Sequence, residues 1–264
     1  MRRNPERGGG VLGRWAVRYA SVFVMLAVWE ISVRGGWVNE FLLPSVSSIL
    51  IRSVEEVGSG SLLRHTGLTV YRALLSFLIA SVLGVLLGTL MSRSRGVRWF
   101  LDPIVSVGFP TPKISFMPIF ILWFGLYDVS KVIMTVFACI FPIISATYLG
   151  TSKVDRYLLW SAQDMGTSER RLLWQVVIPA ALPQILSGLQ IAFPVALIVS
   201  IVTEMLTSGG GLGGYMILAA RFAESERVFL GIVTIAVLGS FLMAAFAALR
   251  RRLLRWHTET SGAL

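Results

Sequence analysis

Long apolar segments alternate with short polar ones along the whole chain, and this pattern predicts a bundle of membrane-spanning helices. The apolar segments come close to the roughly 17–25 residues that a helix needs to cross a bilayer. Six spans are predicted, over residues 15–33, 66–91, 103–124, 129–149, 182–206 and 228–249. The first is the weakest, because its apolar stretch is short, as in a signal peptide. Since the stretch Leu26–Glu30 offers no small-residue cleavage site, we predict a retained helix.

Composition supports an all-α integral membrane protein. Hydrophobic residues make up 55% of the chain and charged residues 14%, against about 25% charged residues in soluble domains. A net charge of +10 would suggest nucleic-acid binding in a soluble protein, but basic residues also collect in the cytoplasmic loops of membrane proteins. We therefore expect membrane lipid, and no nucleic acid, as a partner. The single cysteine, Cys139, lies in an apolar segment and predicts a packing residue, with no disulfide and no multi-cysteine metal site.

The distribution of Lys and Arg predicts the orientation. With the N-terminus placed in the cytoplasm, sixteen of these residues fall in inside segments and six in outside segments. Cytoplasmic loops carry an excess of positive charge, so both termini are predicted to be cytoplasmic. An even number of spans is then required, which agrees with six. Residues 1–264 are expected to form a single transmembrane domain.

The first outer segment predicts a short surface helix. Five apolar residues there recur with the spacing of one helical face, at Val46, Ile49, Leu50, Val54 and Val57. Ser45 fits the N-cap position of this helix. The segment is too short to cross the bilayer, so the helix is expected to lie on the outer surface.

A polar segment at residues 152–181 interrupts the apolar pattern between the fourth and fifth predicted spans. Asp155 fits the N-cap position of a helix over residues 156–165. Gly166 fits the left-handed position that commonly ends a helix. This segment, which we call the elbow, lies on the positively charged side of the predicted topology.

The second half of the elbow predicts another helix. Thr167 or Ser168 can cap a helix that runs through Val177, and Pro179 is expected to stop it. The product is a helix-turn-helix with a polar tip. Two interpretations are open: a cytosolic partner binds the tip, or the helices simply lie at the membrane interface.

The elbow resembles the EAA loop of permease subunits of ATP-binding-cassette (ABC) importers. The pattern of that loop is Glu-Ala-Ala, three residues, Gly, then a spacer and Ile-x-Leu-Pro. Aligned on Gly166, Trp160 stands at the Glu position, Ser161 and Ala162 stand at the two Ala positions, and Ile178 and Pro179 fall near the end. Trp160 therefore departs from the family pattern, which puts in doubt any ion pair at that position.

The resemblance extends over nearly the whole chain and points to the nitrate, sulfonate and taurine branch of importer permeases. The stretches that carry it are Leu43-Pro44-Ser45, Pro112-Lys113-Ile114-Ser115-Phe116-Met117-Pro118, Leu122-Trp123-Phe124-Gly125, Thr203-Glu204-Met205-Leu206 and Gly211-Leu212-Gly213. It implies a type I importer permease fold in a bacterial cytoplasmic membrane. The implied cargo is a small anionic solute such as a sulfonate, taurine or nitrate, moved inward by alternating access. A thiamine-precursor pyrimidine or another small organic solute is the alternative within the family.

The resemblance also implies partners. An ABC ATPase would dock at the elbow, a substrate-binding protein would deliver the solute outside, and two permease copies would form the path. This chain has no Walker A sequence, so it is expected to be no enzyme and to bind no cofactor, with ATP and Mg²⁺ on the partner. The residues expected to couple to the ATPase are Trp160, Ser161, Ala162, Asp164, Met165, Gly166, Thr167, Ser168 and Glu169.

Three residues are candidates for the translocation path or its gate: Lys113, Met117 and Glu204. Lys113 lies in a proline-rich stretch, where prolines remove helical hydrogen bonds and broken backbone is tolerated if it lines a cavity. A cation there could attract an anionic solute, or it could reach the interface or a carbonyl group. Glu204 precedes the glycine-rich run 208–214, which predicts an outer loop that is either part of the gate or docking surface or a plain turn.

Two further charges lie inside predicted spans. Arg72 and Glu30 are close enough to span ends to extend toward the membrane surface, and we expect structural roles for both. An ion-coupled secondary transporter is the main rival class, but it should show internal repeats, and the chain has no convincing one. An intramembrane enzyme is disfavoured because two distant histidines and one cysteine form no catalytic or metal-ligating cluster.

Overall fold

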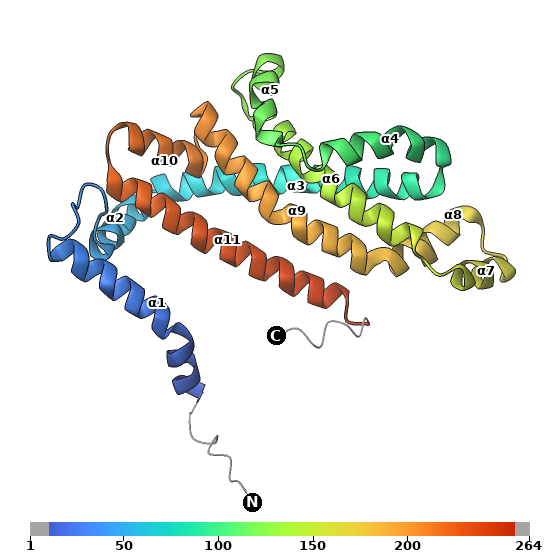
Figure 1. The fold of residues 1–264 in the computed structure, drawn as a ribbon, viewed down its shortest axis with the longest axis horizontal. Coiled ribbons are helices and arrows are strands. Elements are labelled where there is room, and N and C mark those ends of the chain that lie inside the picture. The colour runs from blue at the N-terminus through green and yellow to red at the C-terminus, as the bar shows by residue number, and fades with distance from the viewer. Residues whose placement is uncertain (1–10, 257–264) are drawn as a thin grey trace, which may run out of the picture.

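The computed structural model describes residues 11–256, with side chains from residue 20 onward. The helices are α1 (Val11–Arg34), α2 (Val46–Gly58), α3 (Ser61–Arg93), α4 (Arg95–Gly108), α5 (Met117–Phe124), α6 (Asp128–Ser152), α7 (Arg156–Asp164), α8 (Glu169–Leu172), α9 (Ile178–Thr207), α10 (Gly211–Arg221) and α11 (Ser225–Leu253). A 3-10 helix, Lys113–Phe116, precedes α5, and a π-helix, Leu173–Val177, precedes α9. The long helices form an elongated bundle, with α2 and α10 at one end and α7 and α8 at the other (Figure 1). The predicted cytoplasmic termini lie outside the described residues.

The core of the bundle is formed by α3, α6 and α9. Cys139, Ile143 and Ala192 are completely buried in one apolar cluster between these helices. A Cβ added at Gly84 of α3 would lie 2.7 Å from the Ile143 side chain, so only glycine permits this close helix contact. Small residues at such contacts are typical of membrane proteins, in which packing rather than water exclusion drives helix association. The predicted packing role of Cys139 is confirmed.

Four described helices are long and apolar enough to cross a membrane: α3, α6, α11 and the continuous helix Glu169–Thr207 that contains α9. They correspond to the second, fourth, sixth and fifth predicted spans. Helix α3 has 33 residues and is about 50 Å long at 1.5 Å per residue, so it extends beyond the roughly 30 Å apolar core of a bilayer. The first predicted span falls on α1, whose residues 11–19 have no described side chains, so it stays a prediction.

The third predicted span, residues 103–124, is not a continuous helix. Helix α4 begins at Arg95, eight residues earlier than predicted, and ends at Gly108, and the chain then bends by 101° before continuing through α5. Pro110 and Pro112 lie in the break, where each lacks the N–H group that would continue a helical ladder. The two helical segments on either side of the break, Arg95–Gly108 and Lys113–Phe124, count as a fifth apolar span only if they are taken together.

The short helix predicted after Ser45 is confirmed as α2, and its place on the outer membrane surface stays a prediction. The Ser45 hydroxyl oxygen accepts a hydrogen bond from the Ser48 N–H at 3.2 Å and so caps the first turn. Ile49 and Glu56 are buried against the bundle, whereas Leu50 and Val54 are exposed. The helix therefore covers one end of the bundle with one side only.

The predicted loop at the glycine-rich run is largely a helix. Gly210 and Gly211 turn the chain with φ angles of +74° and +80°, which glycine adopts without strain. Helix α10 then begins at Gly211 and packs back against α9. The loop prediction was wrong because the later glycines are needed for close packing: a Cβ at Gly213 would run into the backbone of Ile201.

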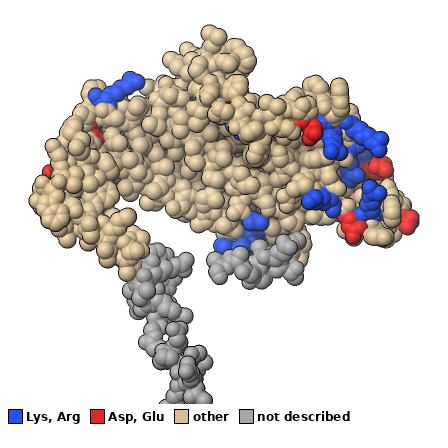
Figure 2. All heavy atoms as spheres, viewed as in Figure 1, with Lys and Arg blue, Asp and Glu red and all other residues tan. Residues whose placement is uncertain are grey.

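Basic residues gather at one end of the molecule (Figure 2). This is the end at which Figure 1 places α7, α8 and the turn between α3 and α4. The last turn of α11 adds three arginines, Arg250 to Arg252. This end is the one that the sequence predicts to face the cytoplasm, and the orientation stays a prediction.

Candidate functional site

The first half of the elbow folds as predicted. Helix α7 spans Arg156–Asp164, and the Asp155 carboxylate caps it by accepting a hydrogen bond from the Tyr157 N–H at 2.9 Å. Gly166 follows with a φ of +76°. Its N–H donates to the Gln163 carbonyl at 2.8 Å, so the left-handed turn closes the end of the helix.

The second half of the elbow differs from the prediction. Helix α8 begins after Ser168, at one of the two predicted cap positions, although the Ser168 side chain makes no capping hydrogen bond. The prediction that Pro179 stops this helix was wrong, because α8 continues through the π-helix into α9. The Ile178 N–H donates to the carbonyl of Leu173, five residues earlier. Pro179 thus enters where the hydrogen-bond pattern changes, in the first turn of α9, where proline is tolerated.

The tip of the elbow exposes apolar and polar side chains together. Trp160 is 53% exposed and Met165 77% exposed, whereas Ala162 is only 6% exposed. The Tyr157 ring packs edge-on against Trp160 with 5.7 Å between centroids. The other predicted coupling residues are exposed or half-buried, namely Ser161, Asp164, Gly166, Thr167, Ser168 and Glu169. Ala162 therefore lies on the buried side of the tip, and the other predicted coupling residues form its accessible surface.

Lys113 lies at the break between α4 and α5 and lines a cavity of about 390 Å³. The other walls come from α6 and α9 and are mostly apolar, including Ala138, Pro142, Val195 and Val199. Lys113 is the one charged residue among those that line it. The arrangement places a cation beside an open, apolar space.

The local partners of Lys113 are neutral. Its ammonium group donates a hydrogen bond to the Phe109 carbonyl and lies 5.7 Å and 5.5 Å from the ring centroids of Phe109 and Phe141. None of the ion pairs among the described residues includes Lys113. Met117, by contrast, is 1% exposed in a cluster with Met134 and Val199 and does not line this cavity.

Glu204 lies at the centre of a buried ion network at the end of the bundle opposite the elbow. Its carboxylate accepts hydrogen bonds from Arg72 at 2.8 Å and from the Thr69 hydroxyl at 2.8 Å. The Gly213 N–H, in the first turn of α10, donates to the same carboxylate at 3.1 Å. Glu204 is completely buried and Arg72 is 3% exposed. The network therefore joins α3, α9 and α10.

Two residues of α6 extend the network toward the surface. Asp128 accepts a hydrogen bond from Arg72 at 2.7 Å and from Lys131 at 3.3 Å. Lys131 is buried and the Asp128 side chain is half exposed. The structure corrects the expectation that Arg72 extends to the membrane surface: its buried guanidinium group is compensated by Glu204 and Asp128, as intramembrane charges require. Glu30 lies near the end of α1, where it pairs with Arg34 at 2.6 Å.

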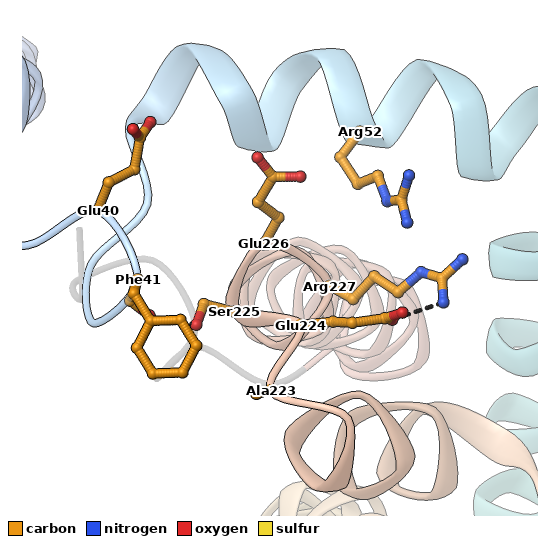
Figure 3. A pocket seen from close by; sticks show the side chains of 8 residues that line it. All are labelled: Glu40, Phe41, Arg52, Ala223, Glu224, Ser225, Glu226 and Arg227. Atoms are coloured by element: carbon orange, nitrogen blue, oxygen red, sulfur yellow. Dashed lines mark hydrogen bonds and ion pairs between the residues drawn. The ribbon is translucent and has the colours of Figure 1, made fainter.

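Sequence reasoning missed the pocket between α2 and the start of α11. It has a volume of about 460 Å³, and its lining includes Glu40, Glu226 and Arg227 (Figure 3). Arg227 pairs with Glu224 and also reaches Glu56 of α2 at 2.8 Å. The pairing ties α2 to α11. Among the described residues, no group of three or more His, Cys, Asp or Glu side chains could hold a metal ion.

Comparison with known proteins decides the family. The model of the family described as "Binding-protein-dependent transport system inner membrane component" matches residues 80–255. The chain belongs to this family. The permease is thus a multi-pass protein of the inner membrane, and the alternatives of a secondary transporter and an intramembrane enzyme are set aside.

Relatives of the permease are similar over most of its length. It is 33% identical over 240 residues to the putative aliphatic sulfonates transport permease protein SsuC of Bacillus subtilis, covering 90% of this chain and 87% of the relative. It is 30% identical to the taurine transport system permease protein TauC of Escherichia coli, covering 89% and 88%. Both relatives are named as transport permease proteins.

The fold of the permease matches solved importer structures. The structure described as inward-facing conformations of the MetNI methionine ABC transporter aligns with a TM-score of 0.62 at 16% identity, over 73% of this chain and 95% of that one. The likeness supports the type I importer permease fold that the sequence predicted. Membership in the family implies an ATPase and a substrate-binding protein as partners.

Proposed function

We propose that two copies of this permease form a path that carries a small anionic solute, such as a sulfonate, taurine or nitrate, into the cytoplasm. ATP binding on a partner ATPase would turn the path outward, and hydrolysis would return it inward. A ligand can shift such an equilibrium only through different affinities for the two states. The similarity to sulfonate and taurine permeases supports this cargo class.

The elbow is the proposed ATPase contact. It lies at the positively charged end of the bundle, and its tip presents Trp160, Met165 and Asp164 to solvent. Because the elbow continues into α9 as one helix of 39 residues, a displacement of the tip would be carried into the membrane. Trp160 replaces the family carboxylate, so we expect apolar packing to hold the ATPase at that position.

The observation that carries the cargo assignment is the uncompensated charge of Lys113. A cation inside a membrane protein normally pairs with an acid or faces water. Lys113 pairs with no acid among the described residues, and it contacts a carbonyl group and two rings at the edge of the open cavity. An anionic solute in the cavity would supply the missing charge. Charge-assisted hydrogen bonds of this kind contribute about 1.5–3 kcal/mol.

Uptake by proteoliposomes tests the assignment. The permease is reconstituted with its ATPase and binding protein, and uptake of radiolabelled taurine or an alkanesulfonate is measured. Lys113→Met should lower uptake by roughly tenfold or more, whereas Lys113→Arg, which keeps the charge, should retain most of it. Unchanged uptake by the Met variant at normal protein levels would remove Lys113 from the path. Selective uptake of a neutral pyrimidine would replace the anionic cargo with the alternative one.

A further inference from the structure

The side of α4 that faces away from the bundle exposes basic and aromatic residues side by side. Trp99 is 82% exposed and Phe100 is 64% exposed. Together with Arg95, Arg98 and Ile104 they line an open hollow of about 760 Å³. Three residues on the opposite side of α4 pack into the bundle, at Val97, Leu101 and Val105. The helix is therefore apolar on two sides, and only one of them is covered by the described chain.

The charges of this hollow are not paired within the protein. None of the ion pairs among the described residues includes Arg95, Arg98 or Asp102, although Asp102 also lines the hollow. Arg98 lies over the Tyr148 ring at 5.2 Å, which holds its guanidinium group near the helix surface. Arg95 and Arg98 are three residues apart and lie on the same helical face. The two guanidinium groups outnumber the single carboxylate, so the hollow favours an anion.

The position of α4 places this hollow at a membrane boundary. Helix α4 begins at the positively charged end of the bundle and runs back beside α3 (Figures 1 and 2). Its basic residues occupy the first turn, and its exposed apolar residues Phe100, Ile104 and Val107 follow toward the middle. Tryptophan is enriched at the level of the lipid headgroups, and Trp99 lies at the junction between the charged and the apolar parts.

We propose that this surface binds an anionic phospholipid of the membrane leaflet at the positively charged end of the bundle. The lipid phosphate would lie against Arg95 and Arg98, and an acyl chain would follow Phe100 and Ile104. Arginine forks match phosphate oxygens, and basic groups beside a membrane attract anionic lipids. One molecule with an anionic head and an apolar tail satisfies both parts of the hollow. Lipid binding at this surface is separate from the transport path and can be measured without a transported solute.

Native mass spectrometry of the full-length permease tests the proposal, with phosphatidylglycerol and phosphatidylcholine as probes. We expect the wild type to prefer phosphatidylglycerol and Arg95→Gln/Arg98→Gln to weaken that binding roughly tenfold or more. The matched control is Arg251→Gln/Arg252→Gln, which removes two exposed charges from α11 and should keep the preference. Asp102→Asn removes the opposing carboxylate and should tighten phosphatidylglycerol binding, a gain that misfolding cannot produce.

Three results would overturn the proposal. Equal losses in the two double variants would mean that total charge, not this hollow, attracts the lipid. Unchanged phosphatidylglycerol binding by Arg95→Gln/Arg98→Gln would remove both arginines from any lipid site. Dissociation of a permease dimer by that variant, with lipid occupancy unchanged, would assign this face to a second copy of the chain.

Discussion

Replacement of Glu204 by glutamine tests whether the buried ion network holds α10 onto the bundle. The two carboxylate oxygens of Glu204 serve three donors: Arg72 binds one oxygen, and Thr69 and the Gly213 N–H share the other. A glutamine keeps one oxygen and offers an amide NH₂ in place of the other. One side of the network must then place a donor against a donor.

The expected loss is large because Glu204 is completely buried. Removal of one partner from a buried pair costs about 3–5 kcal/mol, but Arg72 keeps Asp128, at 2.7 Å, as a second partner. We therefore expect about 3 kcal/mol for Glu204→Gln, the lower end of that range. For a chain of this size the loss corresponds to a decrease of roughly 6–12 °C in melting temperature.

Thermal unfolding of the purified permease in detergent, followed by the loss of its helical signal, measures this effect. Glu55→Gln serves as the control, since its side chain is 57% exposed in its pair with Arg52 and its loss should cost about 1 kcal/mol or less. The double variant Arg72→Met/Glu204→Met removes both charges and should unfold at a higher temperature than Arg72→Met alone. If Glu204→Gln is as stable as the wild type, or if the loss in the double variant equals the sum of the losses in Arg72→Met and Glu204→Met, the ion network does not hold α10 onto the bundle.

Two glycines support further predictions. Gly166 has a φ of +76° with open space around it. Gly166→Asn should keep ATP-driven uptake and Gly166→Ala should lower it, because asparagine tolerates the left-handed region better than alanine. Equal uptake by both variants would show that the left-handed turn is not needed. Gly211 has a φ of +80°, and a Cβ there would collide with the Glu204 carboxylate, whereas the nearest atoms to a Cβ at Gly214 are 3.8 Å away. Gly211→Ala should therefore lower the melting temperature by several degrees, corresponding to about 2 kcal/mol, and Gly214→Ala should leave it close to the wild-type value. A melting temperature that is unchanged in Gly211→Ala would contradict this packing.

The features that the sequence predicted well depend on neighbouring residues. The spans at α3, α6, α9 and α11 follow from continuous apolar segments, and the start of the elbow follows from Asp155 and Gly166. Capping groups and positive φ angles act within a few residues. Local sequence therefore contains the information needed to place these elements.

The features that it missed depend on distant residues. Arg72 and Glu204 are 132 positions apart, and no local pattern shows that one compensates the other. The glycine-rich run, taken alone, predicts a loop. Its helical form depends on α9 and Glu204, against which the first turn of α10 packs. The same limit applies to Pro179. A proline inside a helix usually breaks or kinks it, but the π-helix before Pro179 allows the helix to continue into α9.

Measurement of ATP hydrolysis and solute uptake in the same proteoliposomes shows whether an ATPase drives the permease through the elbow. Gly166→Pro cannot adopt a φ of +76°, because the proline ring fixes φ near −65°. We expect wild-type uptake to require ATP and the binding protein, and we expect the variant to insert normally but to lose uptake while its ATPase still hydrolyses ATP. Wild-type uptake without ATP, or full uptake by the variant, would mean that the elbow does not couple an ATPase to transport.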